Sequence, residues 1–595
     1  MLQDEASAGP LRVEVRPIEL GAVRAAGVEL VRRVYFAVRD PAWGTVEPEI
    51  LERHVERRTG GFALRARCRY TADPIVLDAE LEIGSDDGAV IRFTSTAVAG
   101  SAFAYNRIGF CIHHPPAELA GATLVLGEDE RIELPRRVLP QMRTGETLAP
   151  AVGPFNRLTV TGTSGARLEF RFVGDEFELE DQRNWTDGAF KSYGTPLALG
   201  PPRPLSPGDR LAQTVELRLL DPPRTRKKAR TRIPTLQFAA EATVPAIGFA
   251  TGSSKAAADV ARAVRPSHLR VDLRDGRAAL ERAAHLAETL GSGVQLALHL
   301  PLTDEEHDDL LAVSFDGRLR SVLVLNRDVE IVTDLADAER VRVLLDANGG
   351  MPHLWTGTDA YYAQLNRNLR AGLGPYLTFS MHPQVHATDE QSIVETLEIQ
   401  RDVVLDLKAK HPGCRVSLGA VTFGPRRNFS APPGVDVPEP APDPRQSALF
   451  GTTWSLASVS YLSEAEVDEV TYHRLAGAGG LVDASGHATP LLHLFADCAE
   501  LGGHVTLLES SAPDRATGLA FRSARSIGIL VGNLRAEPTR VRLPVGGRGH
   551  IRRLNEASLS LASRQAKAFH ASRETWDGDS VELEPYEYVR VEVAQ

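Results

Sequence analysis

Short runs in which apolar and polar residues alternate fill the chain from Leu11 to about Leu220. Examples are LRVEV, RLEFRFV and TVELRLL, and glycine, proline and aspartate separate one run from the next. Alternation with a period of two is typical of strands that bury one face, and closely spaced turns are typical of antiparallel sheets. The pattern predicts an N-terminal antiparallel β-sandwich over residues 1–222.

From Pro245 to Cys498 the pattern changes to a short apolar strand followed by a longer, charged helical stretch, repeated along the chain. Eight strands alternating with helices over about 250 residues are typical of a (β/α)₈ TIM barrel. We therefore predict a catalytic barrel over residues 245–503. The predicted strands are Ala246–Ala250, His268–Leu273, Val294–Leu300, Val322–Asn326, Val341–Asp346, Tyr376–His382, Arg415–Thr422 and Glu469–His473.

Two further segments complete the predicted organisation. The basic, proline-containing run DPPRTRKKARTRIP, residues 221–234, indicates a linker, which is predicted over residues 223–244. Residues 504–595 return to short alternating strands, which indicates a small C-terminal β-sandwich. A long proline-rich connection, residues 423–446, follows the seventh predicted strand and is expected to form a lid or binding loop.

Composition and the known short motifs narrow the function. The net charge of −11 disfavours general binding to nucleic acid, and no run of about eighteen apolar residues indicates a membrane span. The first residues do not resemble a secretion signal, so a cytoplasmic location is predicted. The four cysteines lack CxxC spacing, and neither a nucleotide-binding glycine motif nor a GxSxG nucleophile motif occurs. We expect no cofactor, and assembly into a homo-oligomer stays open.

Strand alternation identifies the side chains that should face the mouth of the barrel. When the apolar residues of a strand face the helices, the polar residues between them point inward. This reasoning directs Arg270, Asp272 and Gln295 into the barrel. It places another polar set at the carboxyl ends of the strands, where barrel enzymes carry their chemistry. That set is Asp272, His299, Asn326, Asp346, Asn348, His382 and His386, and Gln384 continues the inward face of His382.

A metal site is the alternative interpretation of the same rim. His382, His386 and Asp389 offer nitrogen and oxygen ligands, but no HExxH spacing occurs. Histidines at strand ends serve equally well as general bases or as donors to an oxyanion. The prediction is therefore a site without a metal.

The stretch GDEFELEDQRNWTDGAFKSYGTPL, in the first domain, concentrates charged and aromatic side chains. Such a stretch is either a solvated loop or a surface that binds a polyol or an acid through bidentate donors. The binding interpretation assigns substrate contacts to six residues. They are Glu180, Arg183, Asn184, Trp185, Asp187 and Lys191.

The sequence resembles the D-apionate lactonase family, whose members open the lactone of an oxidised branched pentose. The stretches that carry the resemblance are NRIGFCIHH, EDQRNWTD, YYAQLNRN, FSMHPQVHATDE, VTFGPRRN and DPRQSALFGTTWSLASVSYL. At Gln364, His382 and Gly424 the chain departs from the residues that the resemblance leads us to expect. The sugar is therefore left open.

A lactonase needs a base that activates water and a donor that polarises the carbonyl group. The resemblance implies a hydrolase that opens an aldonolactone such as D-apionolactone in bacterial carbohydrate catabolism. Asp346 or His386 is expected to be the base, with His299, His382 or Arg445 polarising the carbonyl. Asn348, Gln384 and Arg445 join the first-domain segment as substrate-binding residues.

Two other classes of protein remain as alternatives. A barrel between two sheet domains also suits a glycoside hydrolase with paired carboxylates, although the fourth and seventh strands end in LVLNRD and AVTFGPRRN, without glutamate. A carbohydrate-binding protein without catalytic activity is the second alternative, because a barrel fold alone does not establish chemistry.

Overall fold

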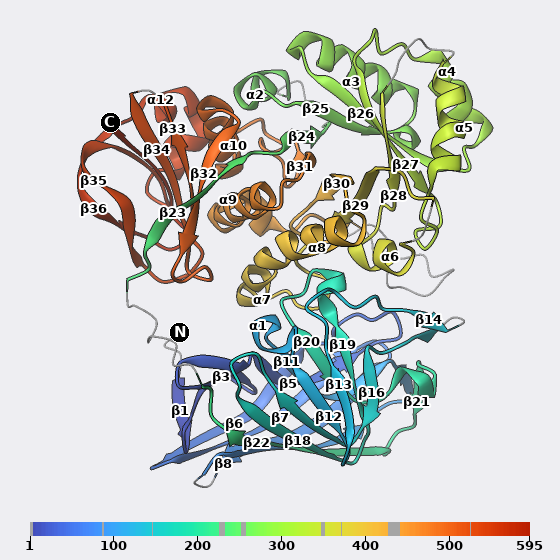
Figure 1. Cartoon of the computed structure of the whole chain (residues 1–595), viewed down its shortest axis with the longest axis vertical. Coiled ribbons are helices and arrows are strands. Elements are labelled where there is room, and N and C mark those ends of the chain that lie inside the picture. The colour runs from blue at the N-terminus through green and yellow to red at the C-terminus, as the bar shows by residue number, and fades with distance from the viewer. Residues whose placement is uncertain are drawn as a thin grey trace. The chain divides into compact units, whose positions relative to one another are not determined.

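The computed structural model describes residues 4–85, 88–144, 147–224, 233–251, 257–346, 352–369, 372–426, 441–523 and 525–594. The described residues divide into two compact units, residues 4–224 and residues 233–594 (Figure 1). The first unit holds the N-terminal sheets, and the second holds the barrel and the C-terminal sheet. Within the described residues, no helix is both long and apolar enough to cross a membrane.

The first unit is built on two large antiparallel sheets, as its alternating pattern predicts. The first sheet is ordered β1 (Asp4–Ala8), β2 (Leu11–Val15), β3 (Leu20–Ala25), β5 (Arg33–Arg39), β11 (Arg107–His114), β20 (Phe190–Tyr193), β19 (Phe177–Asp181) and β16 (Val152–Phe155), with β4 (Val28–Val31) beside β3. The second is ordered β13 (Glu130–Glu133), β12 (Thr123–Leu126), β17 (Arg157–Thr161), β18 (Arg167–Val173), β22 (Arg210–Asp221), β9 (Val90–Ala99), β8 (Ile75–Ser85), β7 (Gly61–Ala72) and β6 (Pro48–Arg58).

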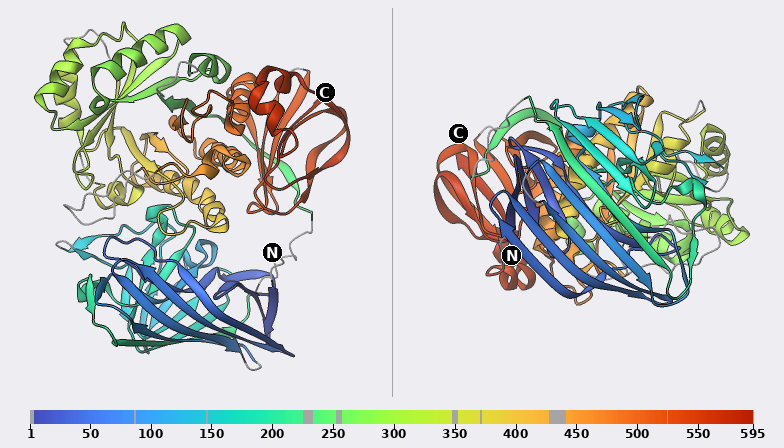
Figure 2. Two further views of the ribbon diagram at one scale, coloured as in Figure 1. Left: turned by 180° about the vertical axis from the view of Figure 1, so that it is seen from behind. Right: turned by 90° about the horizontal axis from the view of Figure 1, so that it is seen from below.

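Alternation along the strands separates the two faces of the first sheet. On β5, Phe36 enters the apolar core of the unit, whereas its neighbour Tyr35 belongs to a separate small cluster with Cys111. The long strands of the second sheet lie side by side (Figure 2) and contribute Phe93 and Phe170 to the apolar core. Two short two-stranded sheets and one short helix also belong to the unit: β10 (Phe103–Tyr105) with β21 (Arg203–Leu205), β14 (Arg143–Thr144) with β15 (Thr147–Leu148), and α1 (Pro116–Leu119).

The second unit contains a closed barrel of parallel strands, which confirms the predicted TIM barrel. Its strands are β24 (Ala246–Ala250), β25 (His268–Asp272), β26 (Gly293–Leu300), β27 (Leu319–Asn326), β28 (His353–Gly357), β29 (Tyr376–Met381), β30 (Arg415–Val421) and β31 (Glu469–Arg474). Its helices are α2 (Ala257–Val264), α3 (Arg277–Leu290), α4 (Asp304–Ala312), α5 (Leu335–Asp346), α6 (Tyr362–Arg367), α7 (Glu390–Glu395), α8 (Leu397–Lys410), α9 (Leu449–Glu464) and α10 (Pro490–Leu501).

The fifth strand is the one that the sequence analysis misplaced. Val341–Asp346 is the end of helix α5, and the fifth strand is β28, His353–Gly357. Val341 and Leu345, four residues apart, are buried, whereas Val343 between them is 65% exposed. That spacing is helical, and the apparent alternation around Val343 is incidental.

This correction moves Asp346 away from the mouth of the barrel. Helix α5 ends at Asp346 and leads into the amino end of β28, so this end of the helix lies opposite the carboxyl ends of the strands. The reason for placing Asp346 at the rim was therefore wrong. Asn348 lies outside the described residues.

The C-terminal sheet begins before the barrel in sequence. Strand β23, within the segment expected to be a linker, pairs with β32, the first strand after the barrel. The order in the sheet is β23 (Leu236–Thr243), β32 (His504–Ser510), β33 (Ala516–Arg522), β34 (Ser526–Asn533), β37 (Tyr588–Ala594), β35 (Thr539–Leu554) and β36 (Glu574–Leu583). Helices α11 (Leu559–Arg564) and α12 (Ala566–Ala571) lie between β35 and β36 in sequence.

A buried carboxylate joins this sheet to the barrel helices. Asp497 on α10 is fully buried and pairs with Arg552 and with Arg590, the latter at 2.8 Å. The Tyr588 hydroxyl donates a third hydrogen bond to it at 2.7 Å. Because a buried charge is stable only when it is paired, this cluster fixes α10 against the C-terminal sheet.

Buried histidines make the fold sensitive to acid. Burial lowers the pKa of His268 to about 4 and the pKa of His493 to about 3, from 6.5. The unfolded chain therefore binds more protons than the folded chain as the pH falls below 6.5, and the free energy of unfolding decreases until about pH 3. Each such histidine contributes up to about 1.4 kcal/mol per pH unit in that range.

Thermal unfolding measured between pH 7.5 and 4.5 should show this loss. A His268→Gln variant should have a weaker pH dependence, whereas His285→Gln, at a side chain 81% exposed, should match the wild type. A melting temperature that stays constant down to pH 4.5 would contradict the prediction.

Candidate functional site

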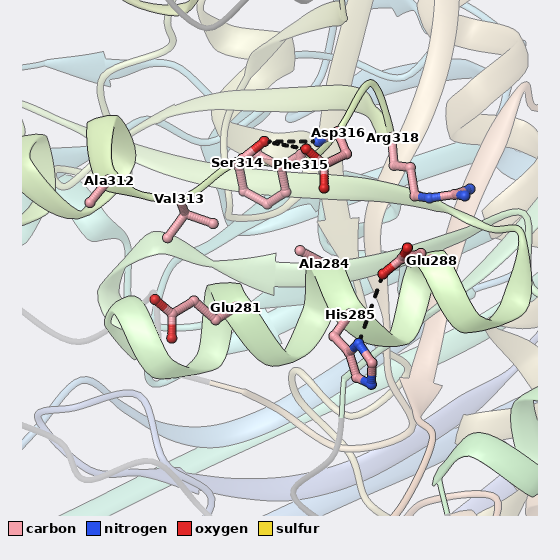
Figure 3. A pocket seen from close by; sticks show the side chains of 10 residues that line it. All are labelled: Glu281, Ala284, His285, Glu288, Ala312, Val313, Ser314, Phe315, Asp316 and Arg318. Carbon is pink, nitrogen blue, oxygen red and sulfur yellow. Dashed lines mark hydrogen bonds and ion pairs between the residues drawn. The ribbon is translucent and has the colours of Figure 1, made fainter.

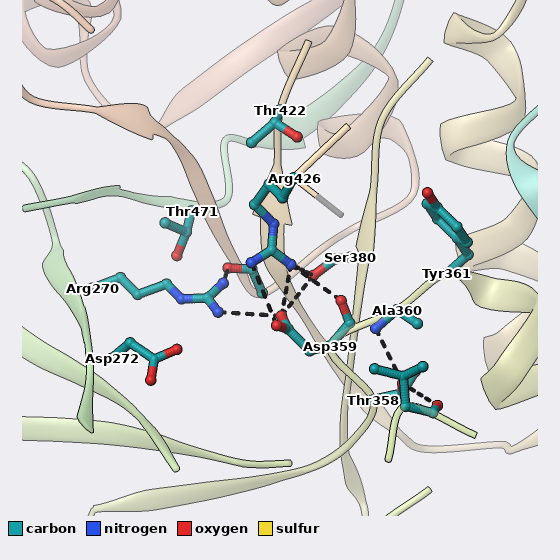
Figure 4. A network of polar contacts seen from close by, with 12 residues as sticks. Arg270, Asp272, Thr358, Asp359, Ala360, Tyr361, Ser380, Thr422, Arg426 and Thr471 are labelled. Atoms are coloured by element: carbon teal, nitrogen blue, oxygen red, sulfur yellow. Dashed lines mark hydrogen bonds and ion pairs between the residues drawn. The ribbon is translucent and has the colours of Figure 1, made fainter. Parts of the chain in front are cut away.

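A network of charged side chains surrounds Asp359, which follows strand β28 at the carboxyl end of the barrel (Figure 4). Its side chain is 3% exposed, and its Oδ1 accepts from Arg426 Nη2 at 2.7 Å and from Arg270 Nη2 at 3.3 Å. His299 Nε2 lies 3.4 Å from the other carboxylate oxygen. Ser380 Oγ completes the network, 3.4 Å from Oδ1.

The alternation of side chains along the barrel strands explains why these groups face the interior. Arg270 and His299 point inward from β25 and β26, and Arg270 also donates to the carbonyl of Gly419 on β30. A Cβ at Gly419 would lie 3.2 Å from Thr378 Oγ1, so a larger residue at this position would crowd that hydroxyl. Asp272 ends β25, where Arg274 holds it at 2.7 Å and His299 Nδ1 lies 3.6 Å away.

Both carboxylates of the network are ionised at neutral pH. Burial alone would raise the pKa of Asp359, but Arg426, His299 and Arg270 hold it well below its usual range. The pKa of Asp272 is likewise lowered, because His299 and Arg274 outweigh its burial. Burial lowers the pKa of Arg270. The network thus fixes charges rather than supplying a carboxylic acid.

A second pair of groups, Tyr361 and His382, lies at the same end of the barrel. The Tyr361 hydroxyl and His382 Nε2 are 2.7 Å apart, and the backbone N–H of Gln384 donates to His382 Nδ1 at 3.1 Å. Since Nδ1 accepts a hydrogen bond, the neutral ring carries its proton on Nε2 and donates it to the phenol oxygen. The phenol proton is then directed away from His382.

Gln384 and Arg445 form a brace between two rim loops. Gln384 donates to the Phe423 carbonyl at 2.8 Å and to Asp443 at 3.0 Å. Arg445 pairs with Asp443 at 2.6 Å and donates to the Thr388 carbonyl at 2.9 Å. These contacts give Gln384 and Arg445 a structural role in holding the two loops together. The predicted role of both residues in binding substrate stays a prediction.

Replacing Arg445 with lysine tests that brace. Lysine keeps the charge but cannot serve Asp443, Gln384 and the Thr388 carbonyl together, so we expect kcat/KM to fall by about tenfold. The melting temperature should stay unchanged, because the side chain is 30% exposed. Arg401→Lys, which alters a similarly exposed ion pair with Asp402 on α8, should leave kcat/KM unchanged. Wild-type kinetics in both Arg445→Lys and Arg445→Ala would exclude a role.

The structure gathers part of the predicted rim set and adds to it. His299 lies within the Asp359 network, His382 pairs with Tyr361, and His386 follows in the same loop. Asn326, at the end of β27, accepts from the Asp328 amide. The sequence analysis missed Asp359, Tyr361 and Arg426. A correct fifth strand would have revealed Asp359 and Tyr361, and Arg426 is within VTFGPRRN.

The charged segment of the first domain forms a buried network of its own. Arg183 pairs with Asp181 at 2.7 Å and donates to the carbonyls of Arg136 and Arg137. The remaining predicted binding residues have comparable partners within the same unit. Glu180 pairs with Arg107, Asn184 donates to the Leu139 carbonyl, Trp185 donates to Gln141, and Lys191 pairs with Asp187. These contacts indicate that the segment stabilises its own domain.

A surface cavity of about 230 Å³ lies at the other end of the barrel (Figure 3). Its walls come from α3 and from the turn that leads into β27, including His285, Glu288 and Arg318. These segments precede the amino ends of the strands, opposite to Asp359. Barrel enzymes carry their active sites at the carboxyl ends, so this cavity is not the candidate active site. Among the residues that the structure describes, no cluster of histidine, cysteine or acidic side chains has an arrangement that would hold a metal ion.

A closed parallel barrel with ionised carboxylates, guanidinium groups and a phenol–imidazole pair at the carboxyl ends of its strands defines a barrel enzyme. Comparison with known families gives the class. Residues 2–222 match the N-terminal domain of D-apionate lactonase, residues 250–503 its TIM barrel domain, and residues 513–591 its C-terminal immunoglobulin-like domain. The chain belongs to the D-apionate lactonase family and is a hydrolase that acts on a lactone.

Individual relatives agree with this family. The D-apionate lactonase of Brucella anthropi is 27% identical over 581 residues, covering 90% of this chain and 93% of the relative. Among solved structures, a GH30 endoxylanase from Clostridium papyrosolvens covers 61% of this chain and 100% of its own, with 10% identity and a TM-score of 0.39. A β-arabinopyranosidase covers 99% and 100%, with 10% identity and a TM-score of 0.32. Similarities this weak carry no functional argument.

Proposed function

We propose that this enzyme hydrolyses the lactone of a sugar acid, D-apionolactone or a closely related aldonolactone, at the carboxyl end of the barrel. The observation that carries the proposal is the Tyr361–His382 pair beside the Asp359 network. The pair provides a neutral proton donor, and the network provides fixed charges. A lactone hydrolase needs both, because negative charge develops first on the carbonyl oxygen and then on the leaving oxygen.

The proposed reaction proceeds in two steps. His386 removes a proton from water, and the hydroxide forms a bond to the lactone carbonyl carbon. The negative charge on the carbonyl oxygen is stabilised by Arg426, whose guanidinium is 25% exposed at the rim. The ring C–O bond then breaks, and Tyr361 donates its proton to the leaving oxygen. The Nε2–H of His382 stabilises the resulting phenolate, which takes up a proton from solvent, while His386 returns to solvent the proton that it removed from water. The product is an open hydroxy acid.

The charge state of the site supports a lactonase over a glycoside hydrolase. Most glycosidases need one carboxylic acid that stays protonated to assist the leaving group. The pKa values of Asp272 and Asp359 are both lowered, so neither suits that role. An ester-like lactone needs no such acid, because a phenol can protonate the alkoxide that leaves.

Proton release during the opening of a panel of aldonolactones tests the proposal, with aryl glycosides assayed in parallel. Turnover on a lactone, equal with and without a chelator, is the expected result. His386→Ala should remove most of it, whereas His285→Ala, on the exposed face of α3, should not. Turnover of aryl glycosides alone would favour the glycosidase. Binding of sugar acids without any turnover would favour a non-catalytic binding protein.

A further inference from the structure

One tyrosine of the C-terminal sheet reaches the rim of the barrel. Tyr586 lies in the turn between β36 and β37, and its hydroxyl donates to Glu390 at the start of α7. Its ring packs on Phe450 of α9, with ring centroids 5.0 Å apart. Helix α7 directly follows the loop 382–389, which carries His382 and His386.

The backbone at this tyrosine is strained. Tyr586 has a φ of +53°, in the left-handed region that residues other than glycine, asparagine and aspartate rarely adopt. The turn is held in place by Glu587, which is fully buried and accepts from the Glu584 amide at 2.7 Å and from Asn555 at 2.9 Å. Such a conformation persists only where the surroundings enforce it, and it often occurs at functional sites.

Contacts continue from this tyrosine to the proposed proton donor. Phe450 packs on Phe423 with ring centroids 5.5 Å apart, and the Phe423 carbonyl accepts from Gln384. The backbone N–H of Gln384 donates to His382, the partner of Tyr361. Glu390 directly follows the same loop, so Tyr586 is connected to the loop by its hydrogen bond to Glu390 and, indirectly, by the ring contacts of Phe450 and Phe423.

We infer that Tyr586 is a positioning residue, through which the C-terminal sheet holds the loop 382–389 in the geometry that the reaction needs. The inference rests on the proposed function, since it assigns the aligned state of His382 and His386 to the active enzyme. It gives the C-terminal domain a part in catalysis without any contact with substrate. A purely structural tyrosine would affect stability but not the loop.

Tyr586→Phe is the test, because phenylalanine keeps the ring on Phe450 and removes only the hydrogen bond to Glu390. We expect kcat to fall by about five- to tenfold while KM changes less than twofold, because fewer molecules hold the loop aligned. Glu390→Gln should give a similar loss, and the double variant should lose no more than either single variant. Hydrogen exchange of the amides in 384–389 should become faster in all three.

Tyr588→Phe is the matched control. This tyrosine lies two residues further on, and its hydroxyl also bonds a carboxylate of the barrel helices, Asp497 on α10, away from the rim loop. The variant should melt at a lower temperature, with kcat and exchange in 384–389 unchanged. Unchanged kcat and exchange in Tyr586→Phe, or equal changes in both variants, would overturn the inference. If no lactone is turned over, hydrogen exchange alone still decides it.

Discussion

Asp359→Asn is expected to lower kcat/KM by roughly a thousandfold and to destabilise the protein. Asparagine keeps the size of the side chain but removes the charge that Arg270, Arg426 and His299 share. Arg270 is 7% exposed and cannot regain water, so the loss of its partner should cost about 3–5 kcal/mol in the free energy of unfolding. The released guanidinium of Arg426 no longer occupies the position that stabilises an oxyanion.

The kinetics should be measured well below the melting temperature of the variant, so that only folded protein contributes. Asp272→Asn is the matched control, because that carboxylate also faces His299 but is 18% exposed, and its arginine partner, Arg274, is itself 24% exposed. We expect its loss in kcat/KM to be about tenfold. A folded Asp359→Asn enzyme within tenfold of the wild type would remove the network from the mechanism.

Tyr361→Phe is expected to lower kcat by a factor between about a hundred and a thousand, with KM nearly unchanged. The phenol is the proposed donor to the leaving oxygen, and removing a donor that acts in the transition state lowers kcat rather than ground-state binding. Stability should also decrease, by about 1–3 kcal/mol, because His382 Nε2 loses its buried acceptor.

The adjacent tyrosine separates these two effects. Tyr362 is equally buried, and its hydroxyl donates to Asp406 on α8 at 2.6 Å, on the outer side of the barrel. Tyr362→Phe should therefore lower the melting temperature to a similar extent without changing kcat. If Tyr361→Phe affects stability alone, as Tyr362→Phe should, another group must protonate the leaving oxygen.

The order of domains and most of the barrel strands could be predicted, because period-two alternation and the change to a helical pattern are local properties of the sequence. The fifth strand could not, since HLWTG is short and has no alternation, whereas the end of α5 imitates a strand. That one error hid Asp359 and placed Asp346 at the wrong end of the barrel. A pattern identifies a face, but the length and position of a weak strand depend on the neighbours that it pairs with.

The roles of the polar residues were harder to predict than their positions. Lys191 and Arg183 are residue types that often bind ligands, but each forms an ion pair with an aspartate of its own domain. Gln384 and Arg445 lie at the rim, but their hydrogen bonds join two loops. The sequence shows which side chains could bind a ligand. Whether a side chain instead forms a hydrogen bond within the protein depends on residues far away in sequence, as Asp443 does for Gln384.

The pairing of β23 with β32 has a consequence for the order in which the chain can fold. Thr243 pairs with His504, so the whole barrel is synthesised between two strands that are neighbours in the C-terminal sheet. On the ribosome, β23 emerges long before its partner and must wait with an unpaired edge, a site at which chains can associate wrongly. Closing so long a loop is slow. The pairing of these two strands therefore cannot precede the synthesis of the barrel, and a chain truncated before His504 would lack the partner strand of β23.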